Sequence, residues 1–187
     1  MADTDLDEVP LHIIHLDQDD PKKCTARKLA RYGYAILHEN SRRPPRRGFL
    51  LDPASGIILG PDDLPFIERG QALVALDCSW KQLDSSLGEV KSRSPRLQGR
   101  TLPLVLAANP VSWGKPGRLS TVEALATCLM LLGRDKQARK ILAPFAWGEQ
   151  FLILNAEPLA AYAAATNRAE LVELQWEFFD KPQLSDS

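Results

Sequence analysis

An acid, a thiol, a hydroxyl and an indole follow one another at the end of an apolar run. The run is Ala72-Leu-Val-Ala-Leu76, and Asp77-Cys-Ser-Trp80 comes directly after it. Such a run is typical of a parallel strand covered on both faces, and ligands in open α/β sheets bind beyond the carboxyl ends of strands. The strand would then deliver an acid, a thiol, a hydroxyl and a large aromatic side chain to that edge. Trp80 could wall a ligand pocket, although core filling is the commoner role of a strand-end tryptophan.

A second candidate ligand segment follows another apolar run, Leu102–Ala107, which we expect to be a buried strand. The next residues, Asn109–Leu119, contain two glycines and two prolines, which permit loop shapes that turn backbone groups toward a ligand. Ser120 and Glu123 have the spacing of a capping box. The helix that starts there would offer unpaired N–H donors to a ligand or an anion.

The sequence contains no G-x-G-x-x-G, G-x-x-x-x-G-K-[ST] or G-x-S-x-G motif. Their absence argues against a conventional dinucleotide site, a P-loop and a nucleophile-elbow hydrolase, in that order. His12 and His15 alternate with apolar residues and are expected to be satisfied, partly buried histidines rather than metal ligands. We expect no metal site. Cys78 is more readily a small core residue than a nucleophile. The 3 cysteines are widely spaced, as expected of reduced thiols in a cytoplasmic protein.

The elements that must position these residues change character along the chain. Strands are expected at 11–16, 34–37, 49–51, 57–59, 72–76 and 102–107, with short helices near 25–32 and 62–70 and a mobile connector over 84–99. Helical spacing follows over 121–132, 136–142, 150–165 and 169–179. The pattern predicts an α/β protein with a parallel-sheet N-terminal half, residues 1–100, and a mostly helical C-terminal half, residues 101–187.

Composition and charge exclude some classes of protein and favour one kind of partner. The chain has 187 residues, 44% of them hydrophobic, and a net charge of −1. It contains no run of about 20 apolar residues and no basic-apolar leader, so we expect neither a membrane span nor a signal peptide. Residues 1–20 hold seven acids and no Lys or Arg, whereas residues 21–47 hold nine bases and one acid. The basic run indicates either a surface for a phosphate backbone or an ordinary solvated face.

Three segments resemble the hallmark blocks of one family: Asp17–Leu29, Leu76–Trp80 and Leu102–Ala124. The stretch Phe145–Tyr162 is also similar, and the blocks occur in the same order between residues 10 and 180. The family is that of the archaeal and eukaryotic small-subunit ribosomal RNA aminocarboxypropyltransferases. Ser112-Trp113 departs from the Asn-Tyr expected there, and Gly117 replaces a common aromatic residue.

The resemblance implies a fold similar to the SPOUT RNA methyltransferases, with a deep trefoil knot in the C-terminal part. It implies transfer of the 3-amino-3-carboxypropyl group of S-adenosylmethionine to N3 of an (N1-methyl)pseudouridine in small-subunit rRNA, with release of 5′-methylthioadenosine. The partner would be this rRNA or its precursor particle, and the enzyme a cytoplasmic monomer without a membrane association.

The resemblance also implies roles for individual residues. Asp77 would be the catalytic residue. It would either bind the amino group of the donor or accept the N3 proton. Trp80 would wall off the S-methyl group. The other expected donor-binding residues are Thr25, Leu51, Pro53, Leu76, Leu102, Gly117, Leu119, Ser120 and Thr121. The expected RNA contacts are Arg27, Lys28, Arg31, Arg43, Arg46, Arg47, Arg96 and Arg100.

Two other functions stay open from the sequence. One is an RNA methyltransferase of the same fold, because a sulfonium activates all three of its carbons and only their orientation selects the group transferred. The other is a non-enzymatic assembly factor that binds precursor rRNA through its basic face. A donor labelled in the methyl group, compared with one labelled in the carboxyl carbon, distinguishes methyl transfer from aminocarboxypropyl transfer. An absence of tight donor binding would indicate the assembly factor.

Overall fold

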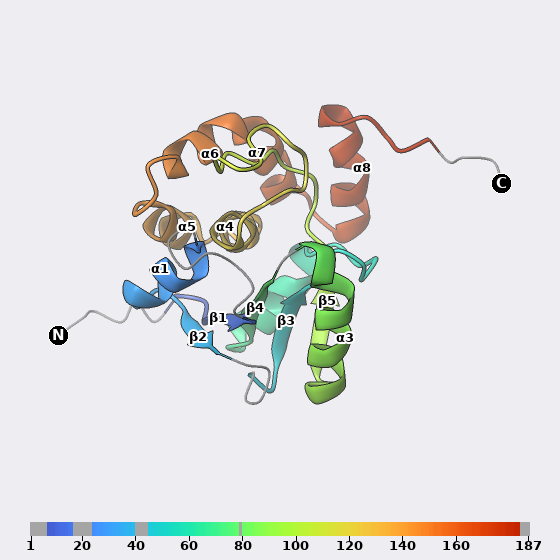
Figure 1. Cartoon of the computed structure of the whole chain (residues 1–187). Helices are drawn as coiled ribbons and strands as arrows, with labels where there is room; N and C mark the ends of the chain where they lie inside the picture. Colours follow the sequence, from blue (N-terminus) through green and yellow to red (C-terminus); the bar gives the residue numbers. More distant parts are fainter. Residues whose placement is uncertain (1–6, 17–23, 40–44, 79, 184–187) are drawn as a thin grey trace.

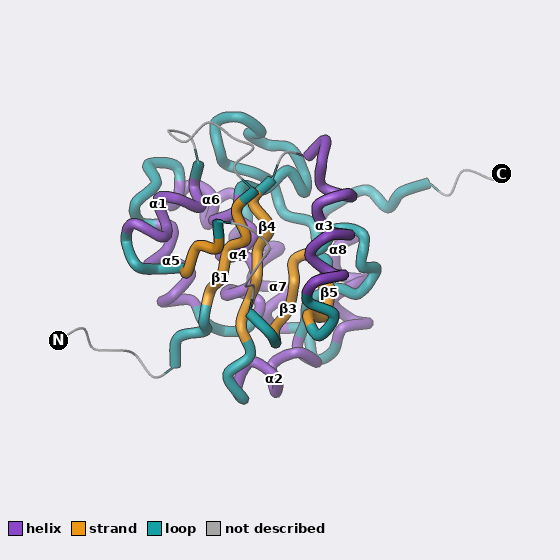
Figure 2. Tube along the Cα trace, turned by 60° about the horizontal axis from the view of Figure 1, so that its bottom comes forward, coloured by secondary structure: helices purple, strands orange, loops and turns teal. Residues whose placement is uncertain are grey.

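A five-stranded parallel sheet forms the centre of the protein. The computed structural model describes residues 7–16, 24–39, 45–78 and 80–183. Its strands are β1 (Leu11–His15), β2 (Ile36–His38), β3 (Gly48–Leu51), β4 (Ala72–Asp77) and β5 (Leu97–Arg100), in the order β2-β1-β4-β3-β5 (Figures 1 and 2). Because every pairing is parallel, the carboxyl ends of all five strands lie at one edge, and Asp77 lies there.

The two faces of the sheet bury alternate residues of each strand. Ile13, Phe49 and Leu73 belong to the larger hydrophobic cluster, whereas their neighbours Ile14 and Leu50 belong to a smaller one on the opposite face. A strand covered on both sides can be apolar at every position. The uninterrupted run that predicted β4 is explained by this double burial.

The smaller cluster is covered by α3 (Leu83–Arg93), in a segment where we expected a mobile connector. That expectation is wrong, because residues 84–99 contain most of α3 and the start of β5. Leu87, Val90 and Leu97 are the buried apolar residues of the segment. The other residues of the segment are mostly exposed and polar, apart from the buried Ser86 and Ser94, and this composition hid the helical period.

The larger cluster is covered by helices from both halves of the chain: α1 (Thr25–Arg31), α4 (Thr121–Leu131), α5 (Asp135–Leu142), α6 (Gly148–Leu154), α7 (Ala156–Ala164) and α8 (Arg168–Phe178). Two 3-10 turns, η1 (Pro61–Asp63) and η2 (Trp80–Gln82), and the short α2 (Leu64–Glu68) complete the described elements. Figure 1 shows α4, α5, α6 and α7 grouped on one side of the sheet, away from α3. Helix α4 contacts β4, α1, α5 and α7, so it is the central helix of this layer.

The prediction of a SPOUT-like fold with a deep trefoil knot is wrong. The described residues form an α/β fold, with eight α-helices arranged around the five-stranded parallel sheet. The helical C-terminal residues do not make a core of their own, because Leu125, Phe151 and Tyr162 share one hydrophobic cluster with Phe49 and Leu73 of the sheet. The boundary expected near residue 100 stays a prediction.

The expected strand over Leu102–Ala107 is also wrong, and side chains take the place of a strand partner. The N–H of Leu106 donates to Asn155 Oδ1 (2.7 Å), and Asn155 Nδ2 donates to the carbonyl of Leu106 (2.8 Å). The N–H of Leu104 donates to Gln175 Oε1 (3.0 Å), and the hydroxyl of Tyr162 donates to the carbonyl of Leu104 (2.8 Å). Buried backbone groups need partners, and three distant side chains supply them here.

Among the helices in the described ranges, none combines the length and the apolar character that crossing a lipid bilayer requires.

Candidate active site at the carboxyl edge of the sheet

The sheet register brings His15 and Asp77 together. Strands β1 and β4 are neighbours, and His15 lies directly opposite Asp77. Both residues continue the alternate positions that face the larger cluster, after Ile13 and Ala75. Their side chains therefore point toward the face covered by α1 and α4.

Three side chains from three elements hold the carboxylate of Asp77. His15 Nδ1 lies 2.7 Å from Asp77 Oδ2, and the thiol of Cys24 donates to the same oxygen at 3.1 Å. The hydroxyl of Thr121, the first residue of α4, donates to Oδ1 at 3.1 Å. A carboxylate oxygen can only accept, so the hydrogen of the His15 bond lies on Nδ1. This cluster, His15, Cys24, Asp77 and Thr121, is called the Asp77 cluster below.

Cys24 also caps a helix. It is the N-cap of α1, and its sulfur accepts from the N–H of Arg27 at 3.5 Å. Burial raises the pKa of the Cys24 thiol to about 11, with the nearby Asp77 carboxylate adding to the effect. The residue is therefore a neutral thiol near pH 7, which is the form that can donate to Asp77.

We expect Cys24 to resist alkylation in the folded protein. Iodoacetamide reacts with the thiolate, and a raised pKa keeps the thiolate population small until the pH approaches about 11. Labelling of Cys24, followed by peptide mass spectrometry at pH 7.5, should be at least about tenfold slower in the native chain than after denaturation. Native labelling at the denatured rate would contradict the buried thiol.

His15, Cys24 and Asp77 each offer an atom that can ligate a metal ion, and the three atoms lie within 4.8 Å of one another. Two ligand atoms of a tetrahedral zinc ion are about 3.4 Å apart, given zinc–ligand distances of about 2.1 Å. The Nδ1–Oδ2 distance of 2.7 Å is instead that of a hydrogen bond. As arranged, the three side chains bind one another, and our expectation of no metal site stays a prediction.

A buried carboxylate fixes the loop beside the Asp77 cluster. Glu123, which is fully buried, accepts from the N–H groups of Ala108 (2.6 Å) and Asn109 (3.0 Å) through Oε1. Its Oε2 accepts from the N–H of Ser120 (2.7 Å) and from Asn109 Nδ2 (2.7 Å). The predicted capping box of Ser120 and Glu123 is confirmed. The additional hold on Ala108 and Asn109 could not be read from the spacing.

The loop between these ends folds back on itself. The N–H of Gly114 donates to the carbonyl of Ala107 (2.7 Å), and the N–H of Gly117 donates to that of Val105 (3.0 Å). Both glycines have a φ near +70°, at 71° and 69°, where side chains other than glycine are strained. Gly117 therefore serves the turn through its backbone, which accounts for a glycine in place of the common aromatic residue.

Five of the ten expected donor-binding residues lie near the Asp77 cluster in the chain, on β4, in the 3-10 turn after it, or at the starts of α1 and α4. Thr25 begins α1 next to Cys24, and Ser120 and Thr121 begin α4. Leu76, which precedes Asp77, is half-buried against the smaller core cluster. Trp80 begins η2, and its side chain lies outside the described part of the structure.

Of the other five, Leu51, Pro53 and Leu102 lie at or just after the carboxyl ends of β3 and β5, whereas Gly117 and Leu119 lie on the loop before α4. Leu51 ends β3, and Pro53 follows it near Thr101, whose hydroxyl lies 3.4 Å from the carbonyl of Pro53. Leu102 comes next in the chain, and it and Leu119 are half-buried against the larger cluster.

The structure separates the expected RNA contacts into several groups. Arg31, Arg46, Arg47 and Arg96 are exposed, Arg27 is half-buried, and Arg43 lies outside the described residues. Lys28 donates to the carbonyl of Pro144 and lies over the ring of Phe145. Arg100 is buried and bound through two nitrogens to Asp63, with distances of 2.9 to 3.1 Å. A guanidinium so enclosed does not reach a phosphate, so the expected RNA contact by Arg100 is withdrawn.

Known proteins of the same size match the chain along nearly its whole length. A family model described as "Ribosome biogenesis protein, C-terminal" matches residues 49–179. A protein of Methanosarcina acetivorans named 16S rRNA aminocarboxypropyltransferase is 44% identical over 94% of this chain and 97% of its own. A protein of Halobacterium salinarum with the same name is 42% identical, over 91% of this chain and 96% of its own.

A solved structure has a similar fold. It is the SAM-dependent rRNA:acp-transferase Tsr3 from Vulcanisaeta distributa, with a TM-score of 0.78 and 34% sequence identity. The match covers 91% of this chain and 96% of that one. The similarity therefore includes both the sheet and the helices that follow it.

A second family model, described as a possible Fer4-like domain in RNase L inhibitor, matches residues 9–43. Iron–sulfur clusters of the ferredoxin kind are held by four cysteine thiolates. Residues 9–43 contain one cysteine, Cys24. The matched segment therefore lacks the four cysteines that would bind an iron–sulfur cluster.

Proposed function

The chain belongs to the 16S rRNA aminocarboxypropyltransferase family, and from this premise we propose that it is an S-adenosylmethionine-dependent enzyme that modifies small-subunit rRNA. The proposed reaction transfers the 3-amino-3-carboxypropyl group to N3 of an (N1-methyl)pseudouridine. The new bond joins N3 to the Cγ of the methionine part, and the bond from that carbon to sulfur breaks with its electron pair on sulfur, so that 5′-methylthioadenosine leaves. N3 gives up its proton in this step, and Asp77 is the candidate acceptor. The names of the relatives favour this reaction over methyl transfer and over a binding function alone.

The carboxyl edge has groups suited to the amino-acid end of the donor. When bound, S-adenosylmethionine supplies a sulfonium that activates the carbon to be transferred. The first turn of α4 offers N–H groups without intrahelical partners, and the hydroxyls of Thr25, Ser120 and Thr121 lie at helix starts. These groups suit a carboxylate, and the carboxylate of Asp77 suits an amino group. The observation that carries the proposal is this convergence of Asp77 with the start of α4, at a Thr121–Asp77 distance of 3.1 Å.

The remaining roles follow from the same placement. Leu102, Gly117 and Leu119 lie on the loop that would frame the adenine through backbone groups, and Leu76 would meet the ribose through its carbonyl. Leu51 and Pro53 would be apolar neighbours. Trp80 would enclose the S-methyl group and keep it from the RNA.

The proposed reaction is tested with two labels. The purified chain is incubated with small-subunit rRNA and S-adenosylmethionine that carries a label in either the carboxyl carbon or the methyl group. Label from the carboxyl carbon in the RNA would support the proposal, and label from the methyl group would support the methyltransferase alternative. Donor binding is measured in parallel by calorimetry, because an absence of binding would indicate an assembly factor.

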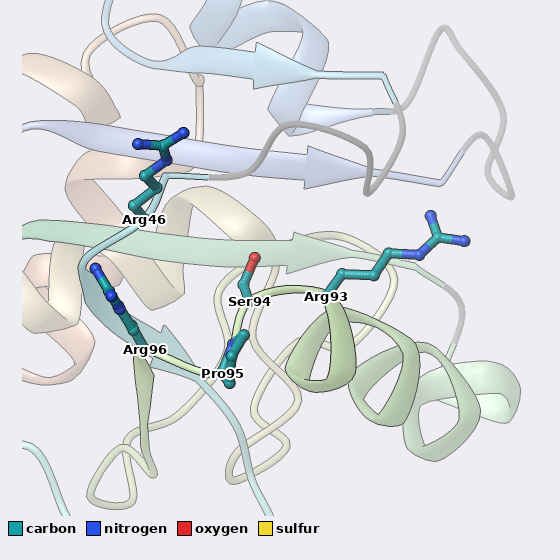
Figure 3. A pocket seen from close by; sticks show the side chains of 5 residues that line it. All are labelled: Arg46, Arg93, Ser94, Pro95 and Arg96. Atoms are coloured by element: carbon teal, nitrogen blue, oxygen red, sulfur yellow. The ribbon is translucent and has the colours of Figure 1, made fainter.

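The exposed arginines at the opposite edge of the sheet are proposed to hold the RNA backbone. Arg46 precedes β3 and Arg96 precedes β5, so both lie at the amino ends of the strands. With Arg93, Ser94 and Pro95 they line a cavity of about 300 Å³. Figure 3 shows Arg93 directed away from the other two arginines. Guanidinium groups bind phosphate without reading its sequence, so this cavity would position the substrate rather than select it.

Removing Arg46 and Arg96 should weaken RNA binding at low salt and reduce its salt dependence. The slope of log K against log salt falls by about 0.7 to 0.9 for each phosphate that the protein no longer binds. The double variant Arg46→Ala/Arg96→Ala should therefore have a slope smaller by about 1.5, as measured by fluorescence anisotropy. A control is Lys136→Ala/Lys181→Ala, which removes two exposed charges, one from α5 and one from the residues after α8. Equal slopes in both variants would place the RNA away from this cavity.

The oligomeric state and the location of the enzyme stay predictions: we expect a monomer, and we expect it in the cytoplasm. The family membership implies small-subunit rRNA as its substrate.

A further inference from the structure

His15 is the most enclosed member of the Asp77 cluster. Only 1% of its surface is exposed, and its Nδ1 lies 2.7 Å from Asp77 Oδ2. The backbone contributes to this contact as well, because His15 and Asp77 are direct partners in the parallel pairing of β1 and β4. The geometry of the pair is therefore fixed at both the main chain and the side chain.

The two oxygens of Asp77 have different surroundings. Oδ2 accepts from His15 and from the thiol of Cys24, both of which belong to the N-terminal part of the chain. Oδ1 is within 3.1 Å of the Thr121 hydroxyl at the start of α4. A carboxylate oxygen has about two lone-pair sites. Two described side chains occupy those of Oδ2 and one occupies Oδ1, so the oxygen beside α4 is the one with room for a further hydrogen bond.

This asymmetry gives His15 a task in catalysis. Without His15, the carboxylate would be held only by the thiol of Cys24 at Oδ2 and the hydroxyl of Thr121 at Oδ1. Its χ2 torsion, which is a broad, roughly two-fold rotor, would then be less restricted. We propose that His15 is a positioning residue that locks the Asp77 carboxylate with Oδ1 directed toward the start of α4. The inference rests on the proposed function, because it concerns the orientation of the residue assigned to catalysis there.

His15 differs from its neighbour on the same strand. His12 lies on the alternate face of β1, where its Nδ1 is 2.9 Å from Nε2 of His38 and the two rings are stacked. Among the contacts of the described residues, none joins His12 to the Asp77 cluster. His12 supplies a matched control, since the same type of residue is changed on the same strand.

The test compares His15→Leu, His15→Asn and His12→Asn with the wild type in the carboxyl-label transfer assay. Leucine removes the donor, whereas the asparagine amide nitrogen takes a place close to that of Nδ1. We expect His15→Leu to lower kcat by about 30-fold, as small misplacements of a catalytic group do, with the KM for RNA changed less than about threefold. His15→Asn should recover most of the lost kcat, and His12→Asn should match the wild type.

Two results would overturn the inference. One is a kcat for His15→Leu equal to that of the wild type. The other is an equal loss in His15→Leu and His15→Asn together with a matching fall of Tm, which would make His15 only a structural residue. A wild type that transfers no carboxyl label would instead refute the proposed function, and this inference with it.

Discussion

Replacing Asp77 by asparagine lowers the turnover of carboxyl-labelled donor by at least about 100-fold. The change removes the charge that would hold the amino group of the donor or accept the N3 proton, and a positioned acid–base group contributes about this much. The amide has nearly the same volume as the carboxylate but no charge. It also puts an amide group in place of oxygens that accept from His15, Cys24 and Thr121. The affinity for RNA should change less than about threefold, because phosphate contacts dominate that affinity. Single-turnover transfer and anisotropy measure the two effects separately.

The exposed acid Asp84 provides the control for this change. Asp84→Asn removes the same charge from the first turn of α3, so its turnover should equal that of the wild type. Equal losses of turnover and RNA binding in Asp77→Asn, with a lower Tm, would mean that the variant is misfolded. Full turnover with normal folding would remove Asp77 from catalysis.

Replacing Glu123 by glutamine should abolish tight donor binding and destabilise the protein. The carboxylate accepts four N–H bonds, from Ala108, Asn109 twice and Ser120. An amide turns one accepting oxygen into a donor, so two of these N–H groups would face another N–H. Hydrogen bonds to a charged group contribute about 1.5 to 3 kcal/mol each, so we expect the free energy of unfolding to fall by about 3 kcal/mol or more. The Kd for S-adenosylmethionine, measured by calorimetry, should rise at least about 30-fold. This rise corresponds to a loss of about 2 kcal/mol of binding free energy.

Denaturant unfolding and calorimetry check the two effects on Glu123→Gln. Glu149→Gln is the matched control, because Glu149 is an exposed glutamate in the first turn of α6. The control should keep both the stability and the donor affinity of the wild type. A stable Glu123→Gln that binds the donor normally would show that the loop between Ala108 and Ser120 does not depend on this carboxylate.

Local patterns predicted the elements whose sequence signal matches their surroundings. The apolar run of β4 is buried on both faces, and the capping box of Ser120 and Glu123 begins α4 as expected. Helices α5 and α8 lie within a few residues of their expected limits. In these elements, the residues that form the pattern are the ones that make the contacts.

Other parts depend on partners that are distant in the sequence. The helix α3 has only a few buried apolar residues, so its sequence has the composition of a solvated linker. The segment Leu102–Ala107 has the composition of a buried strand, but its neighbours are the side chains of Asn155, Tyr162 and Gln175 rather than a strand. The expected knot came only from the resemblance to a family, and no local pattern tested it.

The candidate site was predicted in part. Asp77 and Thr121 were both expected there, and they are in contact. His15 was expected to be a satisfied histidine, and Cys24 was not singled out. The sequence did contain a signal that His15 lies beside Asp77. His15 is two residues after Ile13 on β1, as Asp77 is two residues after Ala75 on β4, so the two side chains lie on the same face of the sheet. Using that signal requires knowing that the two strands are neighbours in this register.

The side-chain partners of Leu104 and Leu106 have a consequence for the order in which the protein matures during synthesis. These hydrogen bonds join residues separated by 49, 58 and 71 positions. Chains emerge from the ribosome N-terminus first, and contacts between distant residues form only when both are available. A nascent chain that has already exposed the sheet and the Asp77 cluster still lacks the groups that shape the loop for the donor. The enzyme would therefore become able to bind its donor only near the end of its own translation.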